Sequence, residues 1–375
     1  MLGKTNITTL SEGAIVTEVE DFKWIQMQSG VYGNFVKAIY KNNYLAAVTA
    51  DGTVVHTTDG EVWQAHQLEY ENCKINDIDW DGSRFLLVGS YTDQDISTDS
   101  SVGLIISTVD FSVFEQIPLI TQDKEYILIY PQNGRYILLS TAGKIVITDL
   151  SNVIESSSVP GYQAALQHIL AAKNTGGFLV YTRRRNSSSS STNYHALHKV
   201  VDGNTEEIKY YSDVDHNSNI IINVFECKDI LYAMGLVTDL NYSLEKITDS
   251  NESMVMCTGQ NFMFVDGTYF NECQLFINKH EMLVLKKGES FADKTLDDLI
   301  EIAPELTMNC ITKAFGQLYI FGNQGVILKS SVETNNEAAI AVQTLSAKKA
   351  LADAKRYMDE QYEVLLTRIE ALENQ

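Results

Sequence analysis

Three carboxylates alternate along one short segment, and they form the most metal-like pattern in the sequence. Asp77, Asp79 and Asp81 precede Gly82, which is the spacing of the first ligands of a helix–loop–helix calcium loop. The last ligand of such a loop should be a bidentate Glu, but that position holds Val88. Apolar residues alternate with the acids, as in a strand that ends at an Asp-Gly turn. The pattern therefore favours a strand and no metal site.

Other residue groups that could do chemistry are incomplete. His195 and His198 are three apart, so on a strand they face opposite ways and cannot share a zinc ion. Arg183, Arg184 and Arg185 could hold a phosphate or a carboxylated sugar, but the serine run after them is typical of a solvated hairpin end. The sequence contains no glycine-rich phosphate loop and no nucleophile elbow. We therefore expect no catalytic residues, no cofactor and no metal.

The cysteines and the overall charge restrict the class of protein further. The five cysteines are far apart and include no Cys-x-x-Cys pair, which favours buried free thiols in a reducing cytoplasm. The formal net charge of −21 argues against nucleic-acid binding and against docking on anionic lipid. No apolar run approaches the roughly 20 residues of a membrane span, and the first residues lack the apolar core of a signal peptide. These features predict a protein made in a reducing cytoplasm without membrane insertion.

The elements that would position any site are short strands. The segment 35–66 forms one complete β unit, with Asp-Gly turns at Asp51-Gly52 and Asp59-Gly60, because both central positions of such turns tolerate positive φ. The strands expected in it are Phe35–Tyr40, Tyr44–Thr49 and Thr53–Thr57, with a fourth that begins at Val62.

Degenerate copies of this unit follow along the chain. They are clearest over residues 75–116, 125–156 and 306–333. Repeats of about 40–50 residues with about four short strands each are typical of a β-propeller. We expect an all-β propeller of six or seven blades, with seven preferred, over residues 31–333. Residues 1–30 are expected to close the ring by completing the last blade, because closure removes exposed edges.

The amino-acid composition and the spacing of apolar residues change after residue 333. Residues 334–375 contain no Gly or Pro, and leucine or methionine recurs every seventh position at Leu351, Met358, Leu365 and Leu372. This pattern predicts a long C-terminal α-helix in a coiled coil, dimeric or trimeric, although a helix packed on its own propeller is an alternative. The residues expected to hold the oligomer together are Leu351, Met358, Tyr362, Leu365, Ile369 and Leu372.

One hairpin carries a resemblance to known propellers. The segment Thr57-Thr58-Asp59-Gly60-Glu61-Val62-Trp63 resembles the Asp-box, the Ser/Thr-x-Asp-Gly-x-x-Trp hairpin of sialidase-type propellers. Its Asp can accept backbone N–H bonds across the turn while its Trp packs between strands, so Thr57, Asp59, Gly60 and Trp63 are expected to be structural. A sialidase also needs an arginine cluster, and outside Arg183–Arg185 and the C-terminal segment only Arg84 and Arg135 remain.

The combination of an Asp-box-like propeller and a heptad tail resembles tail-fibre and baseplate-associated proteins of bacteriophages, and of phage-tail-like bacteriocins, of Gram-positive hosts. The resemblance implies a non-enzymatic structural or adaptor component of such a particle. Its propeller would dock to other tail or baseplate proteins, and its coiled coil would oligomerise. The alternative is a receptor-recognition module that binds cell-surface glycan, and a sialidase-like enzyme is a third hypothesis.

Overall fold

A computed structural model of the chain describes most of the predicted propeller. The described residues are 7–11, 14–17, 23–27, 29–93, 101–118, 123–159, 166–174, 176–185, 193–212, 220–238, 241–247, 253–259, 263–303 and 305–331. The chain divides into two compact units, one of residues 24–331 and one of residues 2–23 with 332–375. In the second unit, β1 (Ile7–Ser11) and β2 (Ala14–Thr17) form an antiparallel hairpin. The predicted coiled-coil helix and its six seam residues lie outside the described residues.

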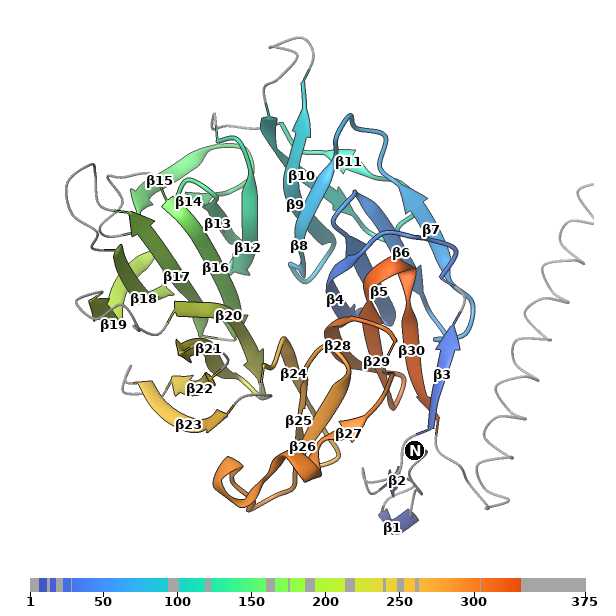
Figure 1. Cartoon of the computed structure of the whole chain (residues 1–375). Coiled ribbons are helices and arrows are strands. Elements are labelled where there is room, and N and C mark those ends of the chain that lie inside the picture. The colour runs from blue at the N-terminus through green and yellow to red at the C-terminus, as the bar shows by residue number, and fades with distance from the viewer. Residues whose placement is uncertain are drawn as a thin grey trace, which may run out of the picture. The chain divides into compact units, whose positions relative to one another are not determined.

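The larger unit is a seven-bladed β-propeller (Figure 1). It contains seven sheets, each of four antiparallel strands, and each sheet is one blade. The first strand of every blade contacts the first strands of the two neighbouring blades, so these strands form a closed ring around a common axis. The expectation of an all-β propeller is therefore confirmed, and the number of blades is seven.

The blades follow the chain in order, and the seventh takes its outer strand from the N-terminal part of the chain. The first three blades are β4 (Phe35–Lys41), β5 (Tyr44–Thr49), β6 (Thr53–Thr57) and β7 (Gln64–Gln67); β8 (Lys74–Trp80), β9 (Phe85–Thr92), β10 (Ser101–Thr108) and β11 (Glu115–Gln116); and β12 (Tyr126–Gln132), β13 (Arg135–Ser140), β14 (Lys144–Thr148) and β15 (Val153–Ser158). Blades four and five are β16 (Leu166–Asn174), β17 (Gly177–Arg185), β18 (Asn193–Val201) and β19 (Asn204–Ser212); and β20 (Ile220–Cys227), β21 (Ile230–Thr238), β22 (Asn241–Ile247) and β23 (Ser253–Gly259). The last two are β24 (Asp266–Phe270), β25 (Cys273–Ile277), β26 (Glu281–Leu285) and β27 (Ile300–Glu301); and β28 (Met308–Ala314), β29 (Gln317–Gly322), β30 (Ile327–Ser331) and β3 (Lys23–Met27). Short 3₁₀ turns cover Phe291–Asp293, Leu296–Asp298 and Asn323–Gly325.

The core lies between blades, which explains why the middle strands are continuous apolar runs. On β5, Leu45 and Ala47 pack against blade seven, whereas Ala46 and Val48 pack against blade two. Because successive side chains of a strand face opposite ways, a sheet covered on both faces needs apolar residues at every position. Each blade therefore depends on both of its neighbours for burial.

The first strands share an irregularity that the sequence pattern does not reveal. Six of the seven have a register shift near their beginning, where one residue is unpaired; in β4, β8 and β28 these residues are Val36, Asn76 and Asn309. The bulge turns polar groups toward the next blade. Asn76 donates to the carbonyl of Tyr126 at 2.8 Å, and Asn309 donates to that of Phe35 at 2.8 Å.

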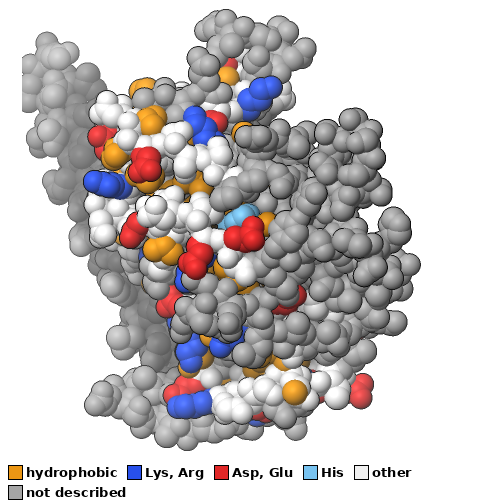
Figure 2. All heavy atoms as spheres, turned by 90° about the vertical axis from the view of Figure 1, so that its left-hand side faces the viewer, with side chains coloured by type: hydrophobic (Ala, Val, Ile, Leu, Met, Phe, Trp, Pro, Cys, Tyr) orange, Lys and Arg blue, Asp and Glu red, His pale blue; other side chains and the backbone are white. Residues whose placement is uncertain are grey.

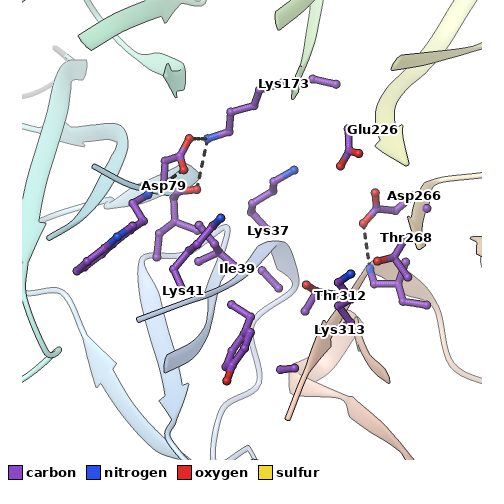
Figure 3. Close-up of a pocket in the computed structure, with 18 of the residues that line it drawn as sticks. Lys37, Ile39, Lys41, Asp79, Lys173, Glu226, Asp266, Thr268, Thr312 and Lys313 are labelled. Carbon is purple, nitrogen blue, oxygen red and sulfur yellow. Dashed lines mark hydrogen bonds and ion pairs between the residues drawn. The ribbon is translucent and has the colours of Figure 1, made fainter. Parts of the chain in front are cut away.

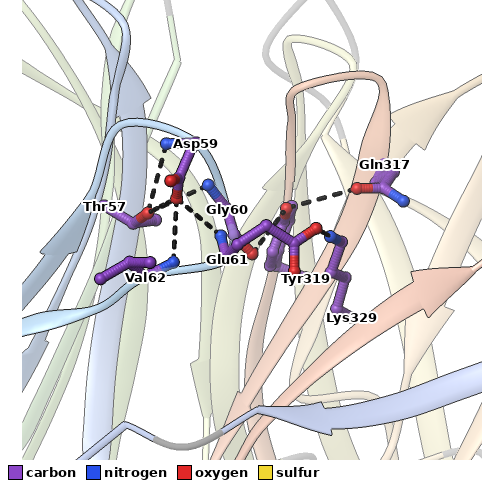
Figure 4. Close-up of polar contacts among 8 residues, drawn as sticks. All are labelled: Thr57, Asp59, Gly60, Glu61, Val62, Gln317, Tyr319 and Lys329. Carbon is purple, nitrogen blue, oxygen red and sulfur yellow. Dashed lines mark hydrogen bonds and ion pairs between the residues drawn. The ribbon is translucent and has the colours of Figure 1, made fainter. Parts of the chain in front are cut away.

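Blades one and seven are joined by polar contacts at the turn after β6 (Figure 4). Lys329 on β30 forms an ion pair with Glu61, and the Tyr319 hydroxyl donates to the carbonyl of Gly60 at 3.5 Å. Gly60 has φ +75°, and a Cβ there would lie 2.0 Å from the Tyr319 oxygen. The position therefore needs glycine both for its backbone conformation and for the close approach of the tyrosine.

The outer wall of the propeller mixes charges of both signs. On the face shown in Figure 2, described acidic and basic side chains are interspersed among polar and apolar ones. No helix in the described part of the chain has the length and apolar character needed to cross a bilayer.

Candidate functional site

A cavity of about 740 Å³ opens around the axis of the propeller, at the C-terminal halves of the first strands. All seven first strands contribute to its lining, from Lys37 on β4 to Ala314 on β28. This volume is in the range of small-molecule sites in proteins. The cavity is therefore the candidate functional site.

Acids near the beginning of two first strands make equivalent contacts at or beside the cavity. Asp77 Oδ2 accepts the N–H of Ile129 at 3.0 Å, and Asp266 Oδ2 accepts that of Ile311 at 2.9 Å. Each joins its own blade to the next. The residue of blade one that is equivalent to Asp77 is Lys37, which follows the bulge of β4 as Asp77 follows that of β8.

One side of the cavity is an internally neutralised ion cluster. Lys173 on β16 reaches across to blade two, where its Nζ lies 2.7 Å from Asp77 Oδ2 and 2.8 Å from Asp79 Oδ2. It also donates to the carbonyl of Ile129 at 3.0 Å. Burial lowers the pKa of Lys173, but the two carboxylates outweigh this effect and raise it. The lysine is therefore cationic and fully engaged.

The opposite side is acidic. Burial raises the pKa of Asp266 to about 6, although the Lys37 ammonium and the N–H groups of Ile311 and Gly267 favour its carboxylate. Burial also raises the pKa of Glu226 on β20, and the nearby Asp229 and Asp266 carboxylates add to this effect. Two acids with raised pKa values in one cavity are a common feature of functional sites.

Three lysines line the cavity on blades one and seven. In Figure 3 the Lys37 side chain projects between the Lys173–Asp79 pair and the Glu226 and Asp266 carboxylates. Lys41 and Lys313 also line the cavity and are exposed. None of the three takes part in an ion pair within 4.0 Å among the described residues. The Lys313 ammonium lies over the Tyr269 ring, 6.0 Å from its centroid, whereas no such contact involves Lys37 or Lys41 among the described residues.

Aromatic side chains complete the wall. Rings from five blades line the cavity, and they are Tyr40, Trp80, Tyr130, Phe270 and Phe315. Tyr40 and Phe315 pack edge to face, with their centroids 4.9 Å apart. Flat apolar surfaces beside charged groups suit a ligand that has both polar and apolar faces.

The Asp-box-like residues lie away from this cavity, at the turn between β6 and β7. The Oδ1 of Asp59 accepts the N–H groups of Glu61 at 2.8 Å and Val62 at 2.9 Å, and Thr57 Oγ1 accepts that of Gly60 at 3.0 Å (Figure 4). Trp63 packs against Phe321 of blade seven, with centroids 5.9 Å apart. These contacts hold the turn together and bring no reactive group near the axis.

The same turn recurs in the next two blades without its glycine. Asp110 accepts the N–H of Ser112 at 3.0 Å, and Asp149 accepts that of Ser151 at 2.7 Å. The position of Gly60 is taken by Phe111 (φ +64°) and Leu150 (φ +69°). Both side chains are buried, and this burial offsets a backbone conformation that non-glycine residues rarely adopt.

The remaining acids, histidines and cysteines that were candidate ligands or reactive groups make contacts that stabilise the fold. Of the three alternating acids, Asp77 and Asp79 hold Lys173, whereas Asp81 accepts the N–H groups of Ser83 and Arg84 in a turn. His198 is buried in β18, and the His195 side chain lies outside the description. Among the described residues, Cys73, Cys227, Cys273 and Cys310 are buried and form no disulfide, and burial raises the pKa of Cys73 to about 11.

The cavity residues Lys37, Lys173, Glu226 and Asp266 were not identified from the sequence. Each is a charged residue within, or at the beginning of, a strand with apolar neighbours, and this is the signal that could have found it. The blade to which each side chain turns depends on the bulges, which no local pattern specifies.

No protein-family model and no curated protein sequence matches this chain. Solved structures share its fold at low identity. Virginiamycin B lyase from Staphylococcus aureus has a TM-score of 0.56 at 10% identity and covers 83% of this chain and 100% of its own. A streptogramin B lyase has a TM-score of 0.54 at 11% identity, covering 83% of this chain and 98% of its own. The WD40 β-propeller domain of Doa1 has a TM-score of 0.53 at 12% identity, with coverages of 84% and 98%.

These likenesses contradict the expectation that the protein is not an enzyme. That expectation came from the lack of a complete catalytic motif and of convergent acids, and from the scarcity of arginine, which argues against sialidase chemistry only. Two of the similar structures are lyases, so this propeller architecture carries catalytic sites of another kind. At this level of identity the likeness shows the fold and assigns no reaction to this chain.

Proposed function

We propose that the protein is a recognition component of a bacteriophage or phage-tail-like particle, whose propeller binds a glycan in the axial cavity. The main support for this proposal is the set of side chains that line the cavity. It combines aromatic rings with carboxylates and ammonium groups, which is the surface that a saccharide needs for its C–H faces and its hydroxyl groups.

The assignment to a tail fibre or baseplate is supported by the sequence alone. It rests on the resemblance of the Asp-Gly hairpin and of the heptad pattern over residues 334–375. In this proposal the protein is made in the bacterial cytoplasm and assembled into the particle. The propeller docks to other tail or baseplate proteins, and the C-terminal segment joins two or three copies, which raises weak single-site affinity for a repeated surface glycan.

The experiment is a glycan-array screen of the full-length chain, followed by titration of each bound glycan against the Lys37→Met variant. Lys37 lies in the cavity without an ion-pair partner among the described residues, so the substitution should weaken binding at least fivefold without unfolding the propeller. The matched control is Lys124→Met, because Lys124 is an exposed lysine outside the cavity lining.

Three outcomes decide the proposal. Binding that is lost in Lys37→Met and kept in Lys124→Met supports the axial site. Equal binding by both variants, or no bound glycan at all, overturns it. Because similar folds include lyases, each bound glycan is also incubated with the protein and analysed for cleavage products, which would add catalysis to recognition.

A further inference from the structure

Two acids from adjacent blades lie on one side of the axial cavity. Glu226 on β20 belongs to blade five and Asp266 on β24 to blade six, and these two first strands contact each other. In Figure 3 both carboxyl groups lie across the cavity from the Lys173–Asp79 pair. Unlike Asp79, neither acid forms an ion pair within 4.0 Å among the described residues.

Backbone donors fix the position of each carboxyl group. Asp266 Oδ2 accepts the N–H of Ile311 on the next blade at 2.9 Å, and Glu226 Oε1 accepts the N–H of Asp229 in the turn after β20. Because main-chain donors do not change rotamer, both acids are held in place before a ligand arrives. A group that transfers a proton needs such a fixed position, since its efficiency depends on the distance to the reacting atom.

The surroundings of the two acids allow one of them to hold a proton near neutral pH. Burial raises the pKa of Asp266 to about 6, and it also raises that of Glu226, an effect to which the Asp266 charge contributes. The Lys37 ammonium opposes both shifts. Cys227 and Cys310 are also near Asp266, but burial raises the pKa of their thiols and keeps them neutral. A protonated carboxyl group beside an ionised one supplies an acid and a base at the same pH.

Groups that suit a sugar lie on the same strands as this pair. Phe270 lines the cavity on β24, the strand that carries Asp266, and Thr268 and Thr312 add hydroxyl groups to the lining. An aromatic ring can pack on the C–H face of a sugar, and hydroxyl groups can bond to its own hydroxyls. A sugar bound on this side of the cavity therefore lies beside the two carboxyl groups.

We propose that the axial cavity hydrolyses the glycan it binds, with Asp266 as the general acid and Glu226 as the general base. This inference rests on the proposed function, because it adds a reaction at the same site. Asp266 donates its proton to the glycosidic oxygen while the bond from that oxygen to the anomeric carbon breaks. A water oxygen bonds to the anomeric carbon, and Glu226 accepts a proton from this water. Solvent then returns a proton to Asp266 and removes one from Glu226, so each cleaved bond consumes one water and no other reactant.

The test uses the full-length chain and two kinds of probe. One is each glycan that binds on the array, with cleavage followed by mass spectrometry as the addition of one water. The other is the p-nitrophenyl glycoside of the terminal sugar of that glycan. Asp266→Asn and Glu226→Gln should each lower kcat/KM for the glycan at least about 100-fold, while its dissociation constant changes less than about threefold. The matched control is Glu155→Gln, an exposed acid on β15 outside the cavity lining, which should keep the wild-type rate.

Two further measurements separate a proton donor from a residue that only supports the fold. Asp266→Asn should retain far more activity on the p-nitrophenyl glycoside than on the glycan, because p-nitrophenolate leaves without being protonated, whereas Glu226→Gln should impair both substrates alike. In the wild type, kcat/KM for the glycan should fall as the pH rises through about 6, since Asp266 acts only when protonated, and Asp266→Asn should lack this fall. The unfolding midpoint of each variant shows whether the propeller is intact.

The outcomes separate this inference from the proposed function. Glycans that bind the wild type and stay intact overturn hydrolysis and leave the glycan site standing. Absence of every array hit overturns both. A cleavage product that is unsaturated and contains no added water overturns hydrolysis in favour of elimination. Cleavage at the wild-type rate in both Asp266→Asn and Glu226→Gln overturns the assignment of the acid and the base.

Discussion

Individual charged residues have different roles in this propeller according to the blade that they face. Asp77 lies near the beginning of β8 and Asp266 at the beginning of β24, and each accepts an N–H from the next blade. Asp77 also forms an ion pair with Lys173 at 2.7 Å, whereas no cation of the described residues lies within 4.0 Å of Asp266, and Lys37 favours its carboxylate from farther away. The Asp77 carboxylate is therefore fully engaged in contacts between blades, whereas the Asp266 carboxylate can still interact with a ligand.

A buried histidine should make stability depend on pH. The Nε2 atoms of His56 and His66 lie 3.2 Å apart, and the His56 ring stacks on Phe111 with centroids 4.7 Å apart. Burial, followed by the charge of His66, lowers the pKa of His56 to about 4, against the opposing carboxylate of Asp110. The unfolded chain therefore binds more protons than the folded one between pH 6.5 and 4. Stability is full above that window and should fall by at most about 3 kcal/mol as the pH drops through it.

Urea unfolding of the wild type and of His56→Gln at several pH values between 7 and 4 measures this contribution. The variant should be less stable at pH 7 and should lose less stability on acidification, because it has no imidazole to protonate. The same dependence on pH in both proteins would show that another group is responsible.

Among the elements, those governed by local chemistry could be predicted and those governed by neighbouring blades could not. Asp-Gly turns and alternating apolar runs predicted the strands of the first unit to within a residue or two, since turn geometry and burial on both faces depend on nearby residues. The turns with Phe111 and Leu150 at positive φ carry no glycine to signal them. The bulges depend on contacts between blades and left no pattern to recognise.

The outer strand of the last blade is a discrete element whose removal should destabilise the propeller. β3 is the fourth strand of the sheet that contains β28, β29 and β30, although it precedes them by about the whole length of the ring. Deletion of residues 1–27 removes its backbone hydrogen bonds and exposes the edge of β30. We expect a loss of about 3–5 kcal/mol, and a fall in melting temperature of about 10 °C, by differential scanning calorimetry.

The matched control is deletion of residues 1–17, which removes the hairpin of β1 and β2 and keeps β3. It should leave the melting temperature of the propeller nearly unchanged. If both deletions have the same effect, the hairpin and not strand closure accounts for the loss. The larger deletion should also promote self-association, since an unpaired edge strand can pair with another chain.

At the scale of the whole molecule, repetition predicted the architecture but not the site. The clear units at both ends of the ring led to a propeller, and the drifting units after residue 160 left the count between six and seven. The axial cavity is built from single residues of all seven first strands, so no contiguous motif marks it. The mistaken expectation of no enzymatic activity has the same origin, because only known sequence motifs were available to argue from.

Assembly is the last property of the whole molecule that can be tested directly. The heptad pattern places Leu365 in the predicted seam of the segment 334–375, where a carboxylate would be buried against a partner helix. Leu365→Asp should therefore reduce a dimer or trimer to a monomer, measured as solution mass by light scattering, with the unfolding transition of the propeller unchanged.

A chain ending at Glu333 should have the same monomeric mass and is the control for complete removal of the segment. If the full-length chain is itself monomeric, self-association through this segment is refuted, and either its own propeller or a different protein must cover its apolar stripe. An unchanged oligomer in Leu365→Asp, together with a monomer on truncation, would move the contact to other residues of the same segment.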